Sequence, residues 1–145
     1  MRPFSTIREI LDEIRALHRE RCEDFAAAAA GATDHRLQAL LSFLRDREAE
    51  QLAALGRFER GGDDLLDGYV QSVPADAMAV AAAGVEPGGD FDAVVRRYRE
   101  RDRALIQVYE QLAAGVGPRA AAAFLGLLEL RRQAQARLRE ALLDA

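Results

Sequence analysis

Residues 6–31 read TIREILDEIRALHRERCEDFAAAAAG, and apolar side chains recur in this stretch at the spacing of a helix rather than a strand. The stretch opens with Thr6-x-x-Glu9, a pattern typical of a capping box at a helix start, and Gly31 favours a helix end. One face of the predicted helix carries Ile7, Ile10, Leu11, Ile14, Leu17, Phe25 and Ala28.

The same apolar period returns three times further along the chain. We expect four helices, at about 6–30, 34–60, 91–114 and 118–143. The first two and the last two are joined by only a few residues, so each pair should form an antiparallel hairpin. Residues 61–89 are rich in Gly and Pro and are long enough to cross a bundle, with a short helix at 74–83. The sequence therefore predicts one all-α domain, 1–145: a four-helix bundle made of two hairpins and a long crossover.

Composition narrows the class of protein. The chain has 145 residues, 50% of them hydrophobic and 30% charged, which excludes a disordered chain. Its net charge is −4 and it lacks a basic tail, which argues against nucleic acid as a partner. No apolar run approaches a membrane span or a signal peptide, and one cysteine, Cys22, excludes an internal disulfide. We therefore expect a cytoplasmic protein.

The two predicted hairpins can be superimposed as an internal repeat. At a shift of 84 residues His18 falls on Asp102, and in the second helix of each pair a shift of 83 places Glu48 on Arg131. The apolar phase and the turn positions agree throughout. The alternative is that any two amphipathic helices can be aligned in this way.

Polar residues from all four helices point inward at one level of the predicted bundle. At about 100° per residue, each lies close to the centre of its helix's apolar face. These residues, which we call the polar layer, are His18, Glu48, Gln51, Asp102 and Arg131. A surface pattern would not place them at one level.

Two hairpins, a long crossover and a polar layer at mid-bundle resemble the ferritin-like superfamily, nearest to its rubrerythrin and bacterioferritin members. In that family a carboxylate on the first helix of each pair precedes an aromatic residue by seven, and the second helix carries Glu-x-x-His. The matching positions are His18…Phe25 and Asp102…Tyr109 for the first pattern, and Glu48…Gln51 and Arg131…Ala134 for the second. The resemblance covers about 6–60 and 90–143.

The departures from the family pattern affect its chemistry. The resemblance implies a di-iron site of four carboxylates and two histidines. Position by position, this chain has His18 for Glu, Glu48 retained, Gln51 for His, Asp102 for Glu, Arg131 for Glu and Ala134 for His. Arg131 always carries its charge, and a divalent ion about 4 Å away would be repelled by roughly 8 kcal/mol at an effective dielectric of 20.

We therefore expect two buried pairs, Glu48–Arg131 and His18–Asp102, in place of the metal. With His18 protonated, the layer is neutral without an ion. One alternative is a reduced mononuclear site in which His18, Glu48 and Asp102 hold one Fe, Mn or Zn ion. Another is that these residues are partly hydrated and have no role.

The sequence favours a binding or interaction protein without cofactor or catalytic residues over an enzyme. The alternative is a metal-binding protein or oxidoreductase with the reduced site. Phe43, Leu125 and Leu143 lie off the apolar faces, which favours a homodimer, since symmetric pairs are the commonest oligomers. Another protein or a small molecule held between helices is a further possible partner.

Overall fold

The computed structural model describes residues 5–71, 73–83 and 89–143. Within these residues, helices are the only regular elements apart from one isolated β-bridge between Thr6 and Tyr69. The all-helical class expected from the sequence is confirmed over this part of the chain. The helices are α1 (Ile7–Gly31), α2 (His35–Glu59), α3 (Asp63–Leu66), α4 (Ala75–Ala82), α5 (Phe91–Ala114) and α6 (Pro118–Leu143).

Short polar side chains begin three of the long helices. The Thr6 hydroxyl accepts a hydrogen bond from the Glu9 backbone N–H at 3.2 Å, at the start of α1. At the start of α2 the Asp34 carboxylate accepts from the Arg36 N–H at 3.0 Å, and at the start of α5 the Asp90 carboxylate accepts from the Ala93 N–H at 2.9 Å. Each bond satisfies one of the N–H groups that a first helical turn leaves without a partner.

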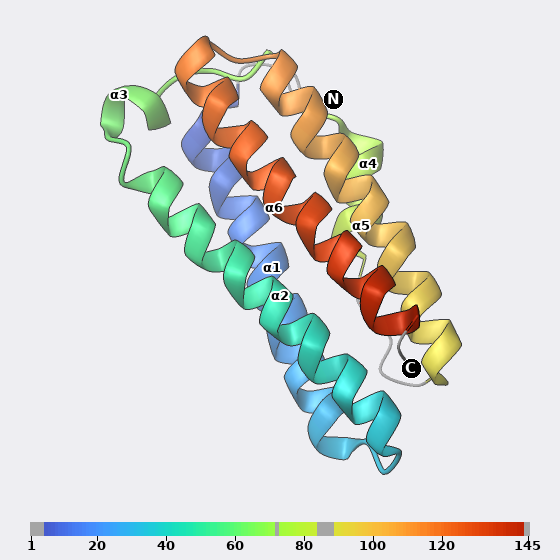
Figure 1. Cartoon of the computed structure of the whole chain (residues 1–145). Coiled ribbons are helices and arrows are strands. Elements are labelled where there is room, and N and C mark those ends of the chain that lie inside the picture. Colours follow the sequence, from blue (N-terminus) through green and yellow to red (C-terminus); the bar gives the residue numbers. More distant parts are fainter. Residues whose placement is uncertain (1–4, 72, 84–88, 144–145) are drawn as a thin grey trace.

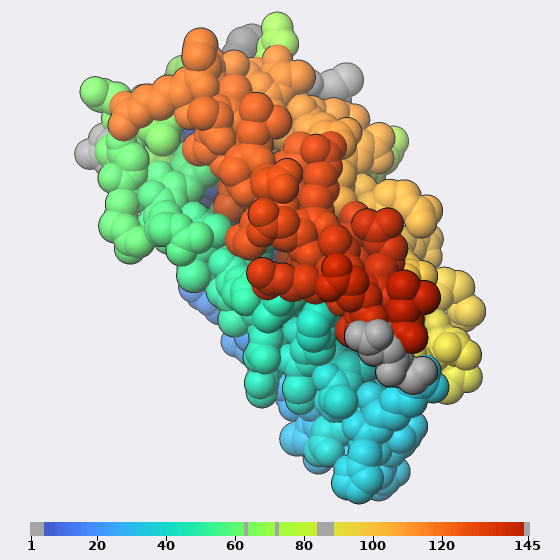
Figure 2. All heavy atoms as spheres, in the orientation of Figure 1, coloured from blue at the N-terminus to red at the C-terminus, as the bar shows by residue number. Residues whose placement is uncertain are grey.

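The four long helices lie roughly alongside one another (Figure 1). α1 packs against α2 and α5 packs against α6, each pair antiparallel, and α2 also contacts α6. The tip of the α1–α2 hairpin projects beyond the neighbouring ends of α5 and α6, and the atoms of α2 and α6 adjoin on the face shown in Figure 2. None of the described helices is both long and apolar enough to cross a membrane.

The segment between the hairpins contains two short helices. The chain leaves α2 at Gly62, whose φ of 102° suits a residue without a side chain. After α3, which the sequence analysis did not anticipate, the Val70 N–H bonds the Ser5 carbonyl at 2.8 Å. α4 occupies most of the short helix expected at 74–83 and packs against α5.

Parts of the expected domain, 1–145, and of the expected crossover, 61–89, lie outside the described residues. These are residues 1–4, 72, 84–88 and 144–145.

The apolar core is divided into two clusters. One lies at the end where α1 begins and includes Phe58 and Phe124, with ring centroids 5.0 Å apart. The other lies towards the α1–α2 loop and includes Phe25 and Tyr98, with ring centroids 5.9 Å apart. On each long helix a short stretch separates the residues of one cluster from those of the other. These stretches carry the buried polar side chains.

Candidate functional site

Buried polar and charged side chains converge between the two core clusters. His18, Glu48, Asp102 and Arg131 are 0% exposed and Gln51 is 1% exposed. The structure therefore brings all five members of the polar layer into the interior, and Ala134 is buried beside them. Each of the four long helices contributes at least one residue.

Glu48 is the most heavily contacted carboxylate of the layer. Its Oε2 accepts a hydrogen bond from His18 Nδ1 and another from Arg131 Nη1 at 3.5 Å. Its Oε1 lies 3.7 Å from Arg21 Nη1, a distance for charge attraction rather than a direct hydrogen bond. Burial alone would raise the pKa of Glu48, but Arg131, His18 and Arg21 outweigh it and lower the pKa to about 2. Glu48 is therefore a carboxylate at neutral pH.

Arg131 connects the carboxylates of two other helices. Its Nε lies 2.9 Å from Asp102 Oδ1, and Nη2 donates a hydrogen bond to the Tyr98 hydroxyl. Burial would lower the pKa of Arg131, but Tyr98, Glu48 and Asp102 raise it well above its ordinary value. Burial raises the pKa of Asp102, although Arg131 opposes this. Arg131 thus keeps its charge inside the protein by lying against both carboxylates.

His18 belongs to a chain of buried hydrogen bonds that links α1, α2, α5 and α6. In the neutral ring, which its lowered pKa favours, Nδ1–H donates to Glu48 and Nε2 accepts from the Tyr109 hydroxyl at 3.2 Å. Gln51 Nε2 in turn donates to the Tyr109 oxygen at 3.1 Å and to the Leu127 carbonyl at 3.2 Å. Burial lowers the pKa of His18, which the attraction of Glu48 opposes without reversing.

The charges of the layer balance in a different way from the sequence expectation. Arg21 and Arg131 supply two positive charges, opposed by Glu48 and Asp102, so a protonated His18 would add an uncompensated charge. The expected pair His18–Asp102 is wrong, because His18 lies against Glu48 and Asp102 lies against Arg131. The expected contact between Glu48 and Arg131 is present at 3.5 Å.

Arg21 is the member of the site that the sequence analysis missed. It is 4% exposed, and its Nη2 donates to the carbonyl of Ala81 in the last turn of α4. Its position contained a signal, because Arg21 lies four residues after Leu17 and four before Phe25, both on the buried face of α1. This bond ties α4 to the polar layer.

The three residues of the alternative metal site are divided by Arg131, since His18 contacts Glu48 whereas Asp102 lies against Arg131. The Arg131 guanidinium contacts Glu48 on one side and Asp102 on the other, in the space that an ion bound by both would need. In the part of the chain that the structure describes, no group of three or more His, Cys, Asp or Glu side chains is arranged to hold a metal ion. His35 is exposed at the start of α2, and Cys22 Sγ lies 3.9 Å from the Arg45 carbonyl.

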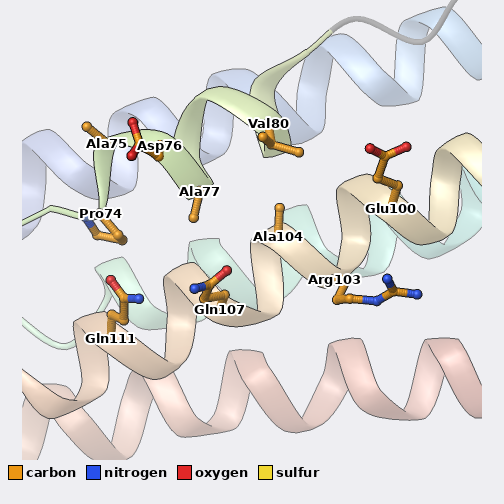
Figure 3. A pocket seen from close by; sticks show the side chains of 10 residues that line it. All are labelled: Pro74, Ala75, Asp76, Ala77, Val80, Glu100, Arg103, Ala104, Gln107 and Gln111. Carbon is orange, nitrogen blue, oxygen red and sulfur yellow. The ribbon is translucent and has the colours of Figure 1, made fainter.

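Open clefts lie around α5 on the surface. The cleft between α4 and α5 has a volume of about 750 Å³ and is shown in Figure 3. One wall of this cleft is formed by Pro74 and by Ala75, Asp76, Ala77 and Val80 of α4. The other wall is formed by Glu100, Arg103, Ala104, Gln107 and Gln111 of α5. Glu100 and Arg103 lie at one end, where a second cleft begins.

Comparisons of the chain with protein-family models, with curated proteins and with solved structures find no match in any of the three.

Proposed function

We propose that this protein is a ferritin-like four-helix bundle whose di-iron site has been replaced by an ionic layer, and that it acts as a non-enzymatic binding or interaction protein. The observation that carries the proposal is the fully buried Arg131, which contacts Glu48 and Asp102 in the middle of the helices. A fixed positive charge there opposes a cation and removes the open coordination that metal chemistry requires.

The position of the layer supports the ferritin-like part of the proposal. His18 and Asp102 are each the twelfth residue of their helices, α1 and α5. Glu48 and Arg131 are each the fourteenth residue of α2 and α6. The side chains of all four are fully buried, as expected for a duplicated hairpin whose two halves once served one site.

Metal analysis tests the proposal directly. We expect protein purified without chelator to contain substoichiometric metal, and to oxidise ferrous iron in air no faster than buffer does. The alternative function is a metal-binding protein or oxidoreductase with one Fe, Mn or Zn ion. It predicts about one ion per chain, which the variants Glu48→Ala and Asp102→Ala would lose.

A variant that restores the six ligand positions of the ferritin-like pattern tests the same proposal through a gain of iron binding. It combines His18→Glu, Gln51→His, Asp102→Glu, Arg131→Glu and Ala134→His, all at buried positions. Because these substitutions, together with the native Glu48, give four carboxylates and two histidines, we expect the variant to bind iron. A folded variant that binds none would contradict the ferritin-like assignment, and wild-type protein is its matched control.

We also propose that the protein is a cytoplasmic homodimer. Leu125 and Leu143 are 51% and 85% exposed, and their separation of 18 residues places them on one line along α6. Light scattering should report twice the chain mass, and Leu125→Asn should shift the mass towards the monomer. Tyr69→Asn, at another exposed apolar residue, is the control; a monomeric wild-type protein would refute the dimer.

A further inference from the structure

Four arginines surround a cleft on the outer side of α5. The cleft has a volume of about 660 Å³ and is bounded by the beginning of α2, the first three turns of α5 and the end of α6. The arginines are Arg36, Arg96, Arg99 and Arg103, and all four are exposed. Among the described residues that line this cleft there is no member of the polar layer, although Asp102 lines the neighbouring cleft between α5 and α6.

The floor of the cleft is apolar. Phe91 and Leu142 are half-buried there and Val95 is buried. The Arg36 guanidinium carbon lies 3.8 Å from the centre of the Phe91 ring, so the guanidinium is stacked on an aromatic face. A stacked guanidinium is held in place and keeps its N–H groups available around its edge.

The positive charge of the rim is only partly balanced. Arg96, Arg99 and Arg103 follow one another at helical spacing on one face of α5, and within the described residues no ion pair with a carboxylate is found for them. Asp92 and Glu100 also line the cleft, which leaves an excess of two positive charges. The whole chain carries −4, so this region has the opposite sign to the protein as a whole.

Positive charge continues into a neighbouring cleft between α5 and α6. This neighbouring cleft, of about 490 Å³, shares Arg99 and Arg103 with the arginine-lined one and adds Arg132 and Arg139, opposed by the carboxylates of Asp102 and Glu110. Arg132 is paired with Glu110 at 3.0 Å, so it is partly neutralised. Arg99 and Arg103 therefore line both clefts.

We propose that the arginine-lined cleft binds a small organic oxyanion, a phosphate ester or carboxylate attached to an aromatic or aliphatic body. Guanidinium groups bind such oxyanions through paired, charge-assisted hydrogen bonds, and the floor of Phe91, Val95 and Leu142 receives the apolar body. A cleft of about 660 Å³ fits a small molecule, whereas a nucleic acid strand requires an extended basic surface.

Calorimetric titration with three probes tests the proposal: 1-naphthyl phosphate, 1-naphthoate and inorganic phosphate. We expect at least one naphthyl probe to saturate at one site per chain and to bind about tenfold or more tightly than inorganic phosphate, because only it covers the apolar floor. Binding of the naphthyl phosphate alone, or of the naphthoate alone, identifies the head group.

Paired triple variants locate the site. Arg96→Gln, Arg99→Gln and Arg103→Gln together should weaken naphthyl binding about tenfold or more, since they remove three charged donors. The control removes the same charge elsewhere, through Arg19→Gln, Arg57→Gln and Arg60→Gln at other exposed arginines, and should keep the wild-type affinity. Equal affinity in the two triple variants, or no saturation by either naphthyl probe, would overturn the proposal; circular dichroism confirms that both variants are folded.

Discussion

The substitution Arg131→Met is expected to lower the free energy of unfolding by about 3–5 kcal/mol, because it leaves two buried carboxylates without their principal counter-charge. Methionine retains much of the unbranched length of arginine, so the effect should come from the missing charge more than from a cavity. Glu48 and Asp102 would each have to take up a proton or draw water into the core. Urea denaturation followed by circular dichroism measures the change.

The matched control for this substitution lies on the same helix. The Arg137 side chain is 52% exposed and its Nη1 lies 3.7 Å from Glu50, so Arg137→Met should change the free energy of unfolding by less than about 0.5 kcal/mol. Combining Arg131→Met with Glu48→Gln and Asp102→Asn should recover part of the loss, because no charge is then stranded. A loss below about 1 kcal/mol for Arg131→Met alone would mean that the carboxylates do not depend on it.

The second large effect is the loss of stability on mild acidification through His18. Burial lowers the pKa of His18 in the folded protein below its ordinary 6.5. Below about pH 6.5 His18 binds a proton in the unfolded chain but not in the folded protein. The free energy of unfolding therefore falls as the pH falls. The slope is at most about 1.4 kcal/mol per pH unit, until the pH reaches the lowered folded pKa.

Comparison of two histidine variants isolates this contribution. His18→Gln should flatten the dependence of the free energy of unfolding on pH between 8 and 5.5, whereas His35→Gln should retain it, because His35 is exposed at the start of α2. Glu48 acts in a lower window: its contribution is present above pH 4.5 and is lost as the pH approaches 2. The contribution of Asp102 to the free energy of unfolding has the opposite sign, since its raised pKa stabilises the protonated form. Both variants retain Glu48 and Asp102, so the difference between their pH profiles removes the contributions of these two carboxyl groups. If the wild-type protein instead gains stability on acidification relative to His18→Gln, His18 is protonated in the folded protein.

The all-helical class could be predicted because apolar spacing is a local property of the sequence. Helical phase also indicated that His18, Glu48, Gln51, Asp102 and Arg131 point inward, and all five are buried. α3 could not be found in this way, because four residues are too few to show a period.

The pairing inside the layer depends on information that helical phase does not contain. Arg131 reaches Asp102 and Glu48 because its side chain is long, and the offset between α5 and α6 decides which carboxylate it meets. Arg21 was overlooked because an arginine usually belongs to the solvated face, although its spacing from Leu17 and Phe25 placed it inside. The arginine-lined cleft likewise depends on how the beginnings of α2 and α5 and the end of α6 come together.

The division of the core into two apolar clusters has a consequence for how the hairpins align. Apolar surfaces alone tolerate sliding, since leucine packs against leucine in many registers. A slip of one helical turn, about 5.4 Å, would carry Arg131 away from Asp102 and Glu48 and press its charge against an apolar cluster. The buried charges therefore disfavour alignments of α6 against its neighbours other than the one in which Arg131 meets Glu48 and Asp102.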